Sequence, residues 1–459
     1  MMNPLSLRTI AQVCSGYYSG ADIFCERVNI DSRRVEHGDL FIALRGDVFD
    51  AHDFLVDAEK AGATAALVEK RQANCLMPQV LVSNTLIALG ELAAFNRAAF
   101  KKKVIALTGS AGKTTTKEMI AAILAQTGNP LVTEGNLNNH IGVPLTLLRL
   151  ALEHESAVIE MGASGLGDIS YLSKMAKPDI ALVSNVAAAH IAGFGSIENV
   201  ALGKKEIFDG LAANGVAIIN LDNAYTANWL ADTAAYFSVL TYSIEKKADV
   251  FAAAIKQTAS GMEFTLCYGG EVCLVSLAFL GRHNVANAVA AAACCLALGK
   301  SLPEVASGLQ RAKPYKGRLQ RKKGLNGCLI VDDSYNANPA SLQMAIDSLM
   351  ACGGEPILVL GDMAELGADA ASMHRAAGEY AHLAGVKKLL AYGELSKATV
   401  AGFGEGARHF ADWQSLADAC LLMADSDAAF LVKGSRSAGM ERVVNALVVS
   451  EKTTEKEKI

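Results

Sequence analysis

The stretch LTGSAGKTTTKE, residues 107–118, decides how the chain around it folds. It follows the apolar run VIA and leads into KTTTKEMIAAILAQTG, where apolar residues recur at helical spacing up to Gly128. A strand, a glycine-bearing turn and a helix start direct backbone N–H groups at a phosphate, with the positive end of the helix dipole behind them. The stretch therefore predicts a nucleotide-binding α/β domain.

The turn is shorter than the usual phosphate-binding signature, whose first glycine stands five residues before the Gly-Lys pair. Here only Ser110 and Ala111 separate Gly109 from the pair Gly112 and Lys113. An ordinary glycine turn between a strand and a helix is the alternative interpretation. The lysine and the threonine that follow the second glycine in register favour the phosphate site.

The side chains after the second glycine supply charge and hydroxyl groups. Lys113 adds a positive charge, and Thr114 can place its hydroxyl on Mg²⁺. Together with Thr115 and the glycine turn, they form the predicted ATP-binding set Gly109, Ser110, Ala111, Gly112, Lys113, Thr114 and Thr115.

The composition is that of a globular chain without a nucleic-acid or membrane partner. It has 459 residues, 51% of them hydrophobic and 19% charged, and a formal net charge of -5. The alanine-rich run of residues 288–298 is shorter than the ~20 residues that span a bilayer. The ten cysteines are scattered without a Cys-x-x-Cys pair, so we expect them to be reduced in a cytoplasmic protein.

Strand and helix patterns divide the chain into three predicted domains: residues 1–100, 101–312 and 313–459. The first is small and mixed. The second alternates buried strands with helices, as a parallel sheet does, and then changes to a predicted antiparallel hairpin in GMEFTLCYGGEVCLVSLAF. The third contains the runs CLIVDD, PILVLGD, KKLLAYG, ARHF and AFLVKG, which predict a further open α/β sheet.

Polar residues follow the strands next to the phosphate loop. Glu160 ends the run AVIE, and Asn185 and His190 follow the run DIALVS. Neighbouring parallel strands end at the same crevice, so these side chains are candidate magnesium ligands. Each alone is more commonly a solvated loop residue, and only their joint placement favours a site.

The motifs TGSAGKTT, EMG, SNVAAAH, RHNVAN and DDSYNANP occur in the order seen in the Mur ligases. These are ATP-dependent amide-forming enzymes of bacterial cell-wall precursor synthesis, and the resemblance covers nearly the whole chain. The motifs LGDMAELG and LVKGSRSAGMERVV look like the member that joins D-alanyl-D-alanine to UDP-N-acetylmuramoyl-tripeptide. The family shares the short phosphate loop.

The resemblance implies an α/β protein of three domains. A small mixed N-terminal domain would hold the UDP end, and a central P-loop ATPase with a mostly parallel sheet would bind ATP. A C-terminal Rossmann-like open sheet would close over ATP and receive the dipeptide. ATP would phosphorylate the tripeptide carboxylate, and the amine of D-alanyl-D-alanine would then displace phosphate from the acyl phosphate. We expect a monomer.

The resemblance also assigns catalytic and metal-binding roles. Thr114 and Glu160 would serve one Mg²⁺ ion and His190 a second. A carbamylated lysine, assigned to Lys204 with Lys205 as the neighbour to test next, would help to hold the second ion. From composition alone both lysines are solvated helix residues. The implied catalytic set is Lys113, Glu160, His190, Lys204 and Arg318.

The remaining implied residues contact the ends of the substrates. For ATP these are Asn284 and Asn287 near adenine, and Arg318 and Asp333 near phosphate and ribose. The substrate-binding set is Ser32, Arg33, Asn138, Asn139, Lys433 and Arg436. Without the resemblance these positions are equally well explained by polar caps, turns and a solvated basic loop.

Two alternative functions stay open. One is another amide ligase of the superfamily, adding a diamino acid to the peptide or glutamate to folate. The other is a P-loop switch, in which ATP changes the conformation without covalent transfer.

Overall fold

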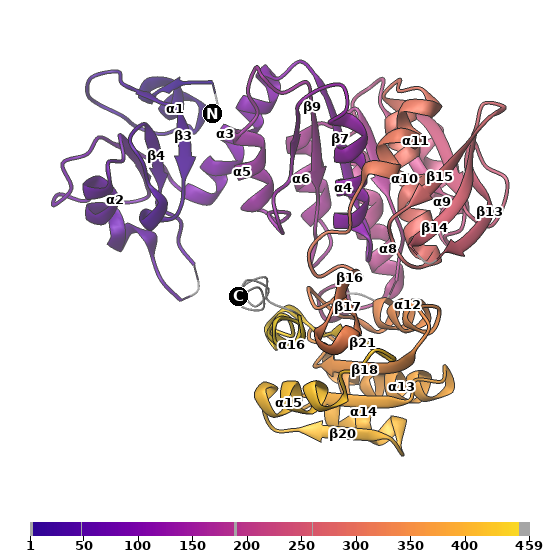
Figure 1. The fold of residues 1–459 in the computed structure, drawn as a ribbon. Helices are drawn as coiled ribbons and strands as arrows, with labels where there is room; N and C mark the ends of the chain where they lie inside the picture. The colour runs from indigo at the N-terminus through magenta and orange to yellow at the C-terminus, as the bar shows by residue number, and fades with distance from the viewer. Residues whose placement is uncertain (1–2, 47, 188–190, 259, 449–459) are drawn as a thin grey trace, which may run out of the picture.

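The structure, a computed structural model, describes residues 3–46, 48–187, 191–258 and 260–448. The chain forms three larger sheets, in consecutive parts of the sequence, and a two-stranded sheet of β1 (Leu5–Ser6) and β2 (Phe24–Cys25). Figure 1 shows the N-terminal part beside the central part and the C-terminal part below it. The predicted α/β fold, with one larger sheet in each of three consecutive parts of the chain, is confirmed.

The N-terminal sheet has four parallel strands in the order β3-β4-β5-β6. The strands are β3 (Arg27–Asn29), β4 (Asp39–Ile42), β5 (Ala65–Val68) and β6 (Gln79–Leu81). The helices are α1 (Leu7–Val13), α2 (Leu55–Ala61), which ends at the left-handed Gly62, and α3 (Thr85–Ala99).

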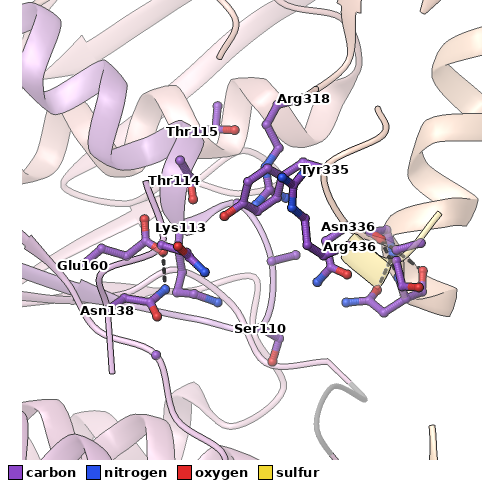
Figure 2. Close-up of a pocket in the computed structure, with 18 of the residues that line it drawn as sticks. Ser110, Lys113, Thr114, Thr115, Asn138, Glu160, Arg318, Tyr335, Asn336 and Arg436 are labelled. Carbon is purple, nitrogen blue, oxygen red and sulfur yellow. Dashed lines mark hydrogen bonds between the residues drawn. The ribbon is translucent and has the colours of Figure 1, made fainter. Parts of the chain in front are cut away.

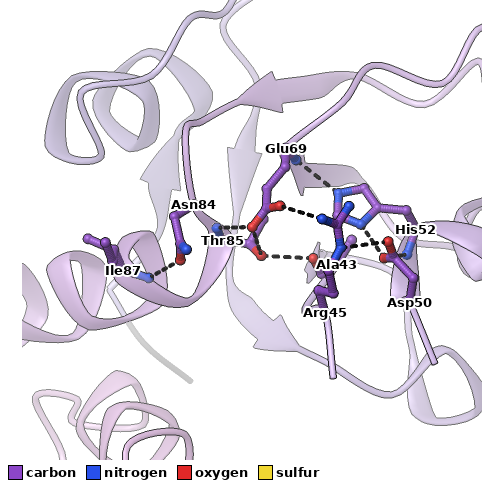
Figure 3. A network of polar contacts seen from close by, with 8 residues as sticks. All are labelled: Ala43, Arg45, Asp50, His52, Glu69, Asn84, Thr85 and Ile87. Atoms are coloured by element: carbon purple, nitrogen blue, oxygen red, sulfur yellow. Dashed lines mark hydrogen bonds and ion pairs between the residues drawn. The ribbon is translucent and has the colours of Figure 1, made fainter. Parts of the chain in front are cut away.

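A polar network ties the loop after β4 to the start of α3 (Figure 3). Asp50 accepts hydrogen bonds from Arg45 Nε at 3.0 Å and from His52 Nδ1 at 2.5 Å. The backbone N–H of Glu69 donates to His52 Nε2 at 2.9 Å, so the imidazole proton lies on Nδ1. Glu69 Oε1 accepts from the backbone N–H of Thr85, the first residue of α3.

The central sheet has nine strands in the order β15-β14-β13-β12-β11-β10-β7-β9-β8. It is parallel from β8 to β13 and antiparallel at β14 and β15. The strands are β7 (Lys103–Thr108), β8 (Pro130–Val132), β9 (Ser156–Glu160), β10 (Ile180–Val183), β11 (Val216–Asn220), β12 (Ser238–Ser243), β13 (Val250–Thr258), β14 (Gly261–Tyr268) and β15 (Glu271–Leu277). The predicted hairpin turns at Gly269 and Gly270, which both have positive φ.

The helices of the central part include α4, which continues from the phosphate loop. It begins at Lys113 and ends at Leu124, four residues before the glycine that the pattern took as its end. The others are α5 (Gly142–Leu148), α6 (Asp168–Ala176), α7 (Ile191–Phe194), α8 (Ile197–Lys205), α9 (Thr226–Thr233), α10 (Arg282–Ala297) and α11 (Leu302–Arg311).

The C-terminal sheet has six strands in the order β16-β17-β21-β18-β19-β20, parallel except for β16. All five predicted runs form strands, and β16 is additional. The strands are β16 (Gln320–Lys323), β17 (Leu329–Asp333), β18 (Glu355–Gly361), β19 (Lys388–Tyr392), β20 (Ala407–Phe410) and β21 (Ala428–Lys433). The helices are α12 (Pro339–Met350), α13 (Ala370–Leu383), α14 (Ser396–Phe403), α15 (Trp413–Met423) and α16 (Glu441–Leu447).

The hydrophobic cores do not follow the three sheets one by one. A single cluster runs from Leu5 in the N-terminal part to Trp229 in the central part, through α3, α5 and α6. A second cluster fills the opposite face of the central sheet around α4 and α10. The C-terminal sheet has its own two clusters, and one of them takes in Leu280 from the central part. The N-terminal and central parts therefore share a core, whereas the C-terminal part keeps a largely separate one.

All ten cysteines lie among the described residues and none is in a disulfide. Eight of them are buried, as expected for reduced core residues. Within the described ranges, no helix combines the length and the apolar composition needed to cross a membrane.

Candidate active site

A cavity of about 790 Å³ lies between the central and the C-terminal sheets. The carboxyl ends of β7 and β9 contribute one wall, and those of β17, β18 and β21 contribute the other. Figure 2 shows Lys113, Glu160 and Asn138 on one side and Arg318, Tyr335 and Arg436 on the other. Because parallel strands expose their C-terminal ends at the same edge, both sheets place loops and helix starts at this cavity.

The phosphate loop needs its two glycines for different reasons. A Cβ on Gly109 would lie 2.0 Å from Ser184 Oγ, so the loop can pass the end of β10 only without a side chain. Gly112 has φ +76°, and a Cβ there would lie 2.3 Å from Asn287 Oδ1. The shortened spacing therefore produces a loop pressed between β10 and α10.

Asn185 holds this loop in place. Its Oδ1 accepts from the backbone N–H of Ala111 at 2.9 Å, and its Nδ2 donates to the Ala111 carbonyl oxygen at 2.9 Å. The Ser110 N–H donates to the Asn185 carbonyl oxygen at 3.1 Å. The side chain that the sequence suggested as a magnesium ligand thus contacts the loop backbone instead.

The start of α4 is open to an anion. Within the described chain it has no side-chain cap and no acidic residue in its first turn, where Lys113, Thr114 and Thr115 lie. Lys113 Nζ donates to the Gly109 carbonyl oxygen at 2.7 Å. Burial lowers the pKa of Lys113; Glu160 opposes this shift, and the charge of Arg318 adds to it. Unpaired N–H groups and a lysine converge here, as a phosphate requires.

Glu160 is a buried acidic group of this wall. It is 2% exposed, and its Oε1 accepts from Asn138 Nδ2 at 2.8 Å. Its Oε2 is buried without a hydrogen-bond partner in the described structure. A buried carboxylate oxygen left unsatisfied is costly unless a ligand such as a cation meets it. No cluster of three or more His, Cys, Asp or Glu that could hold a metal ion occurs among the described residues, so the described site is not a carboxylate cage.

Asn284 and Asn287 line the cavity from α10 and are both buried. Asn287 Nδ2 donates to Asn284 Oδ1 at 3.0 Å, and Asn287 Oδ1 accepts from Thr116 Oγ1 at 3.3 Å. Asn284 Nδ2 donates to the Leu280 carbonyl oxygen at 2.7 Å. The pair therefore joins α10 to α4 behind the phosphate loop.

Asn139 also lines the cavity, but its side chain caps α5. Its Oδ1 accepts from the N–H groups of Ile141 and Gly142 at 3.1 and 2.9 Å. Asn138, by contrast, lies against Glu160.

On the C-terminal wall, Asp333 and Lys433 pair across adjacent strands β17 and β21. Lys433 is 2% exposed; its Nζ donates to Asp333 Oδ2 and, at 2.9 Å, to the Asn336 carbonyl oxygen. Asp333 Oδ1 accepts from the Leu319 N–H at 3.1 Å. Burial lowers the pKa of Lys433, and the Asp333 carboxylate opposes that shift. Both residues, predicted as ligand contacts, are thus bonded to each other.

Arg318 and Arg436 flank Tyr335 on the same wall. The Arg318 guanidinium carbon lies 4.1 Å from the centre of the Tyr335 ring, and that of Arg436 lies 5.8 Å from it. Arg318 Nε is buried without a partner in the described structure. Arg436 also contacts Glu441 at 3.4 Å.

Lys204, near the end of α8, is 2% exposed and lies outside the cavity lining. Burial lowers its pKa to about 7, and the charge of Lys113 acts in the same direction. Its Nζ lies 5.6 Å from the centre of the Phe194 ring. The expectation of a solvated lysine is therefore wrong for Lys204. Lys205 is the exposed neighbour, and it pairs with Asp232.

Two predicted substrate-binding residues stand apart from the cavity, and one predicted metal ligand cannot be placed. Ser32 and Arg33 lie in a short 3-10 helix of the N-terminal part, where Arg33 is 85% exposed and pairs with Asp31. His190 falls outside the described residues.

Several lining residues were not singled out from the sequence. Tyr335 and Asn336 stand in the motif DDSYNANP, and His283 stands in RHNVAN, so the motifs contained the signal. Burial lowers the pKa of His283 to about 4, and Lys433 acts in the same direction. Ala364 and Leu366 follow β18 in LGDMAELG and complete this wall.

Three family models match consecutive parts of the chain. They are described as Mur ligase family, catalytic domain (residues 25–97), Mur ligase middle domain (residues 107–295) and Mur ligase, glutamate ligase domain (residues 317–436). The matches follow the order of the three sheets, and the middle one starts within β7.

Similar proteins and structures cover nearly the whole chain. UDP-N-acetylmuramoyl-tripeptide--D-alanyl-D-alanine ligase of Escherichia coli (strain K12) is 45% identical, over 97% of this chain and 99% of that protein. A crystal structure of MurF from Acinetobacter baumannii has a TM-score of 0.91 at 35% identity, covering 97% of this chain and 98% of that one.

A MurF ligase from Thermotoga maritima in complex with ADP has a TM-score of 0.82 at 28% identity, covering 94% of this chain and 98% of that one. The agreement spans all three sheets and includes a nucleotide complex. With the phosphate loop, the buried glutamate and the cationic wall facing them, it leads to one conclusion: the chain belongs to the Mur ligase family.

Proposed function

We propose that the protein is an ATP-dependent ligase that joins D-alanyl-D-alanine to UDP-N-acetylmuramoyl-tripeptide in peptidoglycan precursor synthesis, releasing ADP and phosphate. The observation that carries the proposal is the facing arrangement of the phosphate loop and Glu160 with Arg318 across one cavity. The full-length similarity to proteins that bear this ligase's name supports it.

The chemistry begins from an unreactive group. A carboxylate resists attack by an amine, so an oxygen of the tripeptide carboxylate first attacks the γ-phosphorus of ATP, and the bond to ADP breaks. The amine nitrogen of D-alanyl-D-alanine then attacks the acyl carbon. The amide bond forms as phosphate leaves with the electron pair, and the nitrogen loses its proton.

Negative charge accumulates on the transferring phosphoryl oxygens in the first step. Lys113 and the open N–H groups of α4 meet that charge from one wall, and Arg318 meets it from the other. The cavity lies between two sheets, so a closer approach of the C-terminal part would exclude water from the acyl phosphate.

The residues present also fit a magnesium ion. Mg²⁺ takes one or two protein carboxylates and fills its other positions with water and phosphate oxygens. Glu160 offers a buried, unpaired carboxylate oxygen beside the phosphate loop, and Thr114 offers a hydroxyl at the start of α4. A bound Mg²⁺ ion would neutralise phosphate oxygens and polarise the phosphorus. His190 is proposed for a second ion.

Lys204 is proposed to be carbamylated. Only a neutral amine reacts with CO₂, and a pKa of about 7 gives Lys204 a large neutral fraction at physiological pH. The product would be a carboxylate next to the positive charge of Lys113, which favours it over the buried ammonium. Lys205 has a carboxylate partner instead and is the weaker candidate.

The other predicted contacts extend from this centre. Asn284 and Asn287 are proposed for the adenine side, and Asp333 for the ribose. Asn138 and Asn139 would meet the peptide near Glu160, and Ser32 with Arg33 would meet the UDP end. Lys433 and Arg436 are proposed for the dipeptide carboxylate, although Lys433 would first have to leave Asp333.

The three sheets are proposed to act as the domains of residues 1–100, 101–312 and 313–459, for the UDP end, ATP and the dipeptide respectively. A monomer and a cytoplasmic location remain predictions.

The test is a product assay with two acceptors. The protein is incubated with ATP, Mg²⁺ and UDP-N-acetylmuramoyl-tripeptide, and with either D-alanyl-D-alanine or a free diamino acid. Phosphate release and product mass are measured. Product with the dipeptide alone supports the proposal. Product with the diamino acid alone identifies a sibling ligase, and phosphate release that ignores both acceptors identifies a switch.

A further inference from the structure

Arg318 is a cation without a carboxylate partner in the described structure. The nearby carboxylate, Asp333, is taken by Lys433 and by the Leu319 N–H. Arg318 Nε is buried without a hydrogen-bond partner in the described structure. In addition to burial, the positive charge of Arg318 lowers the pKa of both Lys113 and Lys433. A long flexible side chain among like charges needs some other contact to keep it in the cavity.

The face of Tyr335 supplies that contact. The guanidinium lies 4.1 Å from the ring centre, well inside the ~6 Å range of a cation–π contact. The backbones are joined as well, since the Tyr335 N–H donates to the Gly317 carbonyl oxygen at 3.2 Å. Tyr335 therefore contacts the segment that leaves the central part twice, through its backbone N–H at Gly317 and through its ring at Arg318.

An aromatic face differs from a carboxylate in its effect on the arginine. A carboxylate would fix the guanidinium by neutralising it, which would weaken its attraction for phosphate. A ring face holds the guanidinium plane and leaves its N–H groups and its net charge to a ligand. Tyr335 and Glu160 of the opposite wall line the same cavity.

We propose that Tyr335 is a positioning residue that holds Arg318 at the transferring phosphoryl group. Arg436, at 5.8 Å from the same ring and already paired with Glu441, depends on it less. The inference rests on the proposed ligase reaction, because it concerns charge that develops only during phosphoryl transfer.

The test compares ring-bearing and ringless side chains at position 335 in the full-length enzyme. Tyr335→Leu should lower kcat roughly tenfold, as expected for one lost cation–π support, and change the KM for ATP by less than about twofold. Tyr335→Phe should keep the wild-type kcat, because it retains the ring face. Tyr335→Met, which fills irregular space flexibly, repeats the ringless test if the leucine variant unfolds.

A double-variant cycle separates positioning from packing. In the Arg318→Ala background, Tyr335→Leu should cause no further fall in kcat. In the Arg436→Ala background, Tyr335→Leu should still lower kcat by most of the factor seen in the wild-type background. Phe410→Leu is the matched control: it removes the Arg408–Phe410 contact, of the same kind at 4.8 Å, from β20 outside the cavity lining. Its kcat should equal that of the wild type.

The outcomes are distinct. A wild-type kcat in both ringless variants, or losses from Tyr335→Leu and Arg318→Ala that simply multiply, overturns the positioning role. A wild-type protein that makes no amide product overturns the ligase proposal itself, before any variant is compared.

Discussion

One of the two boundaries between the three sheets is an apolar core, and the other is a polar cavity. Between the N-terminal and central parts, α3 packs into a continuous apolar core with α5 and α6. Asn96 Nδ2 donates across it to the carbonyl oxygens of Leu147 and Leu150, and Arg97 donates to those of Ala176 and Lys177. Between the central and C-terminal parts lies a cavity lined mainly by polar and charged side chains.

We call the first the boundary that holds, because it fixes two parts of the molecule to each other. The second is the reactive boundary, because it contains the proposed active site. An apolar core loses burial if its halves separate, so the first boundary favours a fixed arrangement. At the second boundary, direct contacts include Leu280 in the C-terminal core and the hydrogen bond from Gln257 Nε2 to the Ala351 carbonyl oxygen. Such a boundary can open for substrates and close for chemistry.

The largest expected effect is at Lys204, which lies outside the cavity lining but whose pKa is lowered by burial and by the charge of Lys113 within it. Lys204→Ala should abolish amide formation, because it removes the amine that we propose to carry a carbamate. Added short carboxylic acids should restore part of the activity by supplying a carboxylate in the space left by the side chain. Phosphate release and product mass are measured with and without acetate.

Lys205→Ala is the control for this variant, since Lys205 is paired with Asp232. It should retain most of the activity. Full activity in Lys204→Ala, or acetate rescue of Lys205→Ala instead, would assign the role elsewhere.

Glu160→Gln tests the orphaned oxygen of the reactive boundary. The amide cannot replace a carboxylate at a cation, so kcat should fall roughly hundredfold or more, and the half-saturating Mg²⁺ concentration should rise. Steady-state rates over a Mg²⁺ titration measure both. Glu271→Gln, exposed at the far edge of the central sheet, should match the wild type. An unchanged Mg²⁺ response in Glu160→Gln would contradict the metal role.

Asn96→Leu tests the boundary that holds. It removes the side-chain donor to the buried Leu150 carbonyl oxygen, whereas the Leu147 oxygen keeps a hydrogen bond from the Leu150 N–H at 3.1 Å, so the free energy of unfolding should fall by about 1–3 kcal/mol. Denaturant unfolding measures this change. Asn129→Leu, at an exposed position, should stay within about 0.5 kcal/mol of the wild type. An equal loss of unfolding free energy in the two variants would contradict the role of the Asn96 hydrogen bonds in stabilising the first boundary.

Asp50→Asn tests the network behind α3. Burial alone would raise the pKa of Asp50, but hydrogen bonds from His52 and Arg45 lower it to about 2. A lowered carboxylate pKa stabilises the fold above about pH 4, and this contribution disappears as the pH falls toward 2. The variant should lose about 1 kcal/mol at pH 7 after solvent screening, and nothing near pH 2. A pH-independent difference in unfolding midpoint would contradict the network's ionic character.

The smallest effect is expected at Arg33, in the N-terminal part. Its side chain is exposed and, among the residues that the structure describes, pairs only with Asp31, so Arg33→Ala should leave the unfolding midpoint unchanged. The KM for the UDP substrate alone should rise by a small factor, because a charge-assisted contact is lost. Isothermal titration with UDP gives an independent measure. Unaltered UDP affinity would remove Arg33 from the proposed substrate set.

The local pattern of the sequence was enough for the phosphate loop and for Glu160. Both lie at the ends of β7 and β9, which are neighbours in a parallel sheet, so strand order alone brings them together. The chain positions of most strands followed from apolar runs, and the Gly269–Gly270 turn followed from its residue types. Among the strands that were not predicted, β6 and β16 are short and only partly buried.

Contacts between distant segments could not be predicted in this way. Asp333 and Lys433 are a hundred residues apart, and only the pairing of β17 with β21 makes them partners. Burial of Lys204 depends on the packing of α8, which its charged sequence does not suggest. Asn185 was chosen as a polar residue after a strand, but its side-chain amide forms hydrogen bonds with the backbone of the phosphate loop.

The shared core has a consequence for synthesis on the ribosome. Its members extend from Leu5 to Trp229, so the first hundred residues emerge with an apolar face that only later segments cover. The C-terminal clusters begin at Leu280 and can consolidate afterwards as a unit. Protease cleavage near residues 312–318 should therefore release two compact fragments, whereas cleavage near residue 100 should leave halves that aggregate.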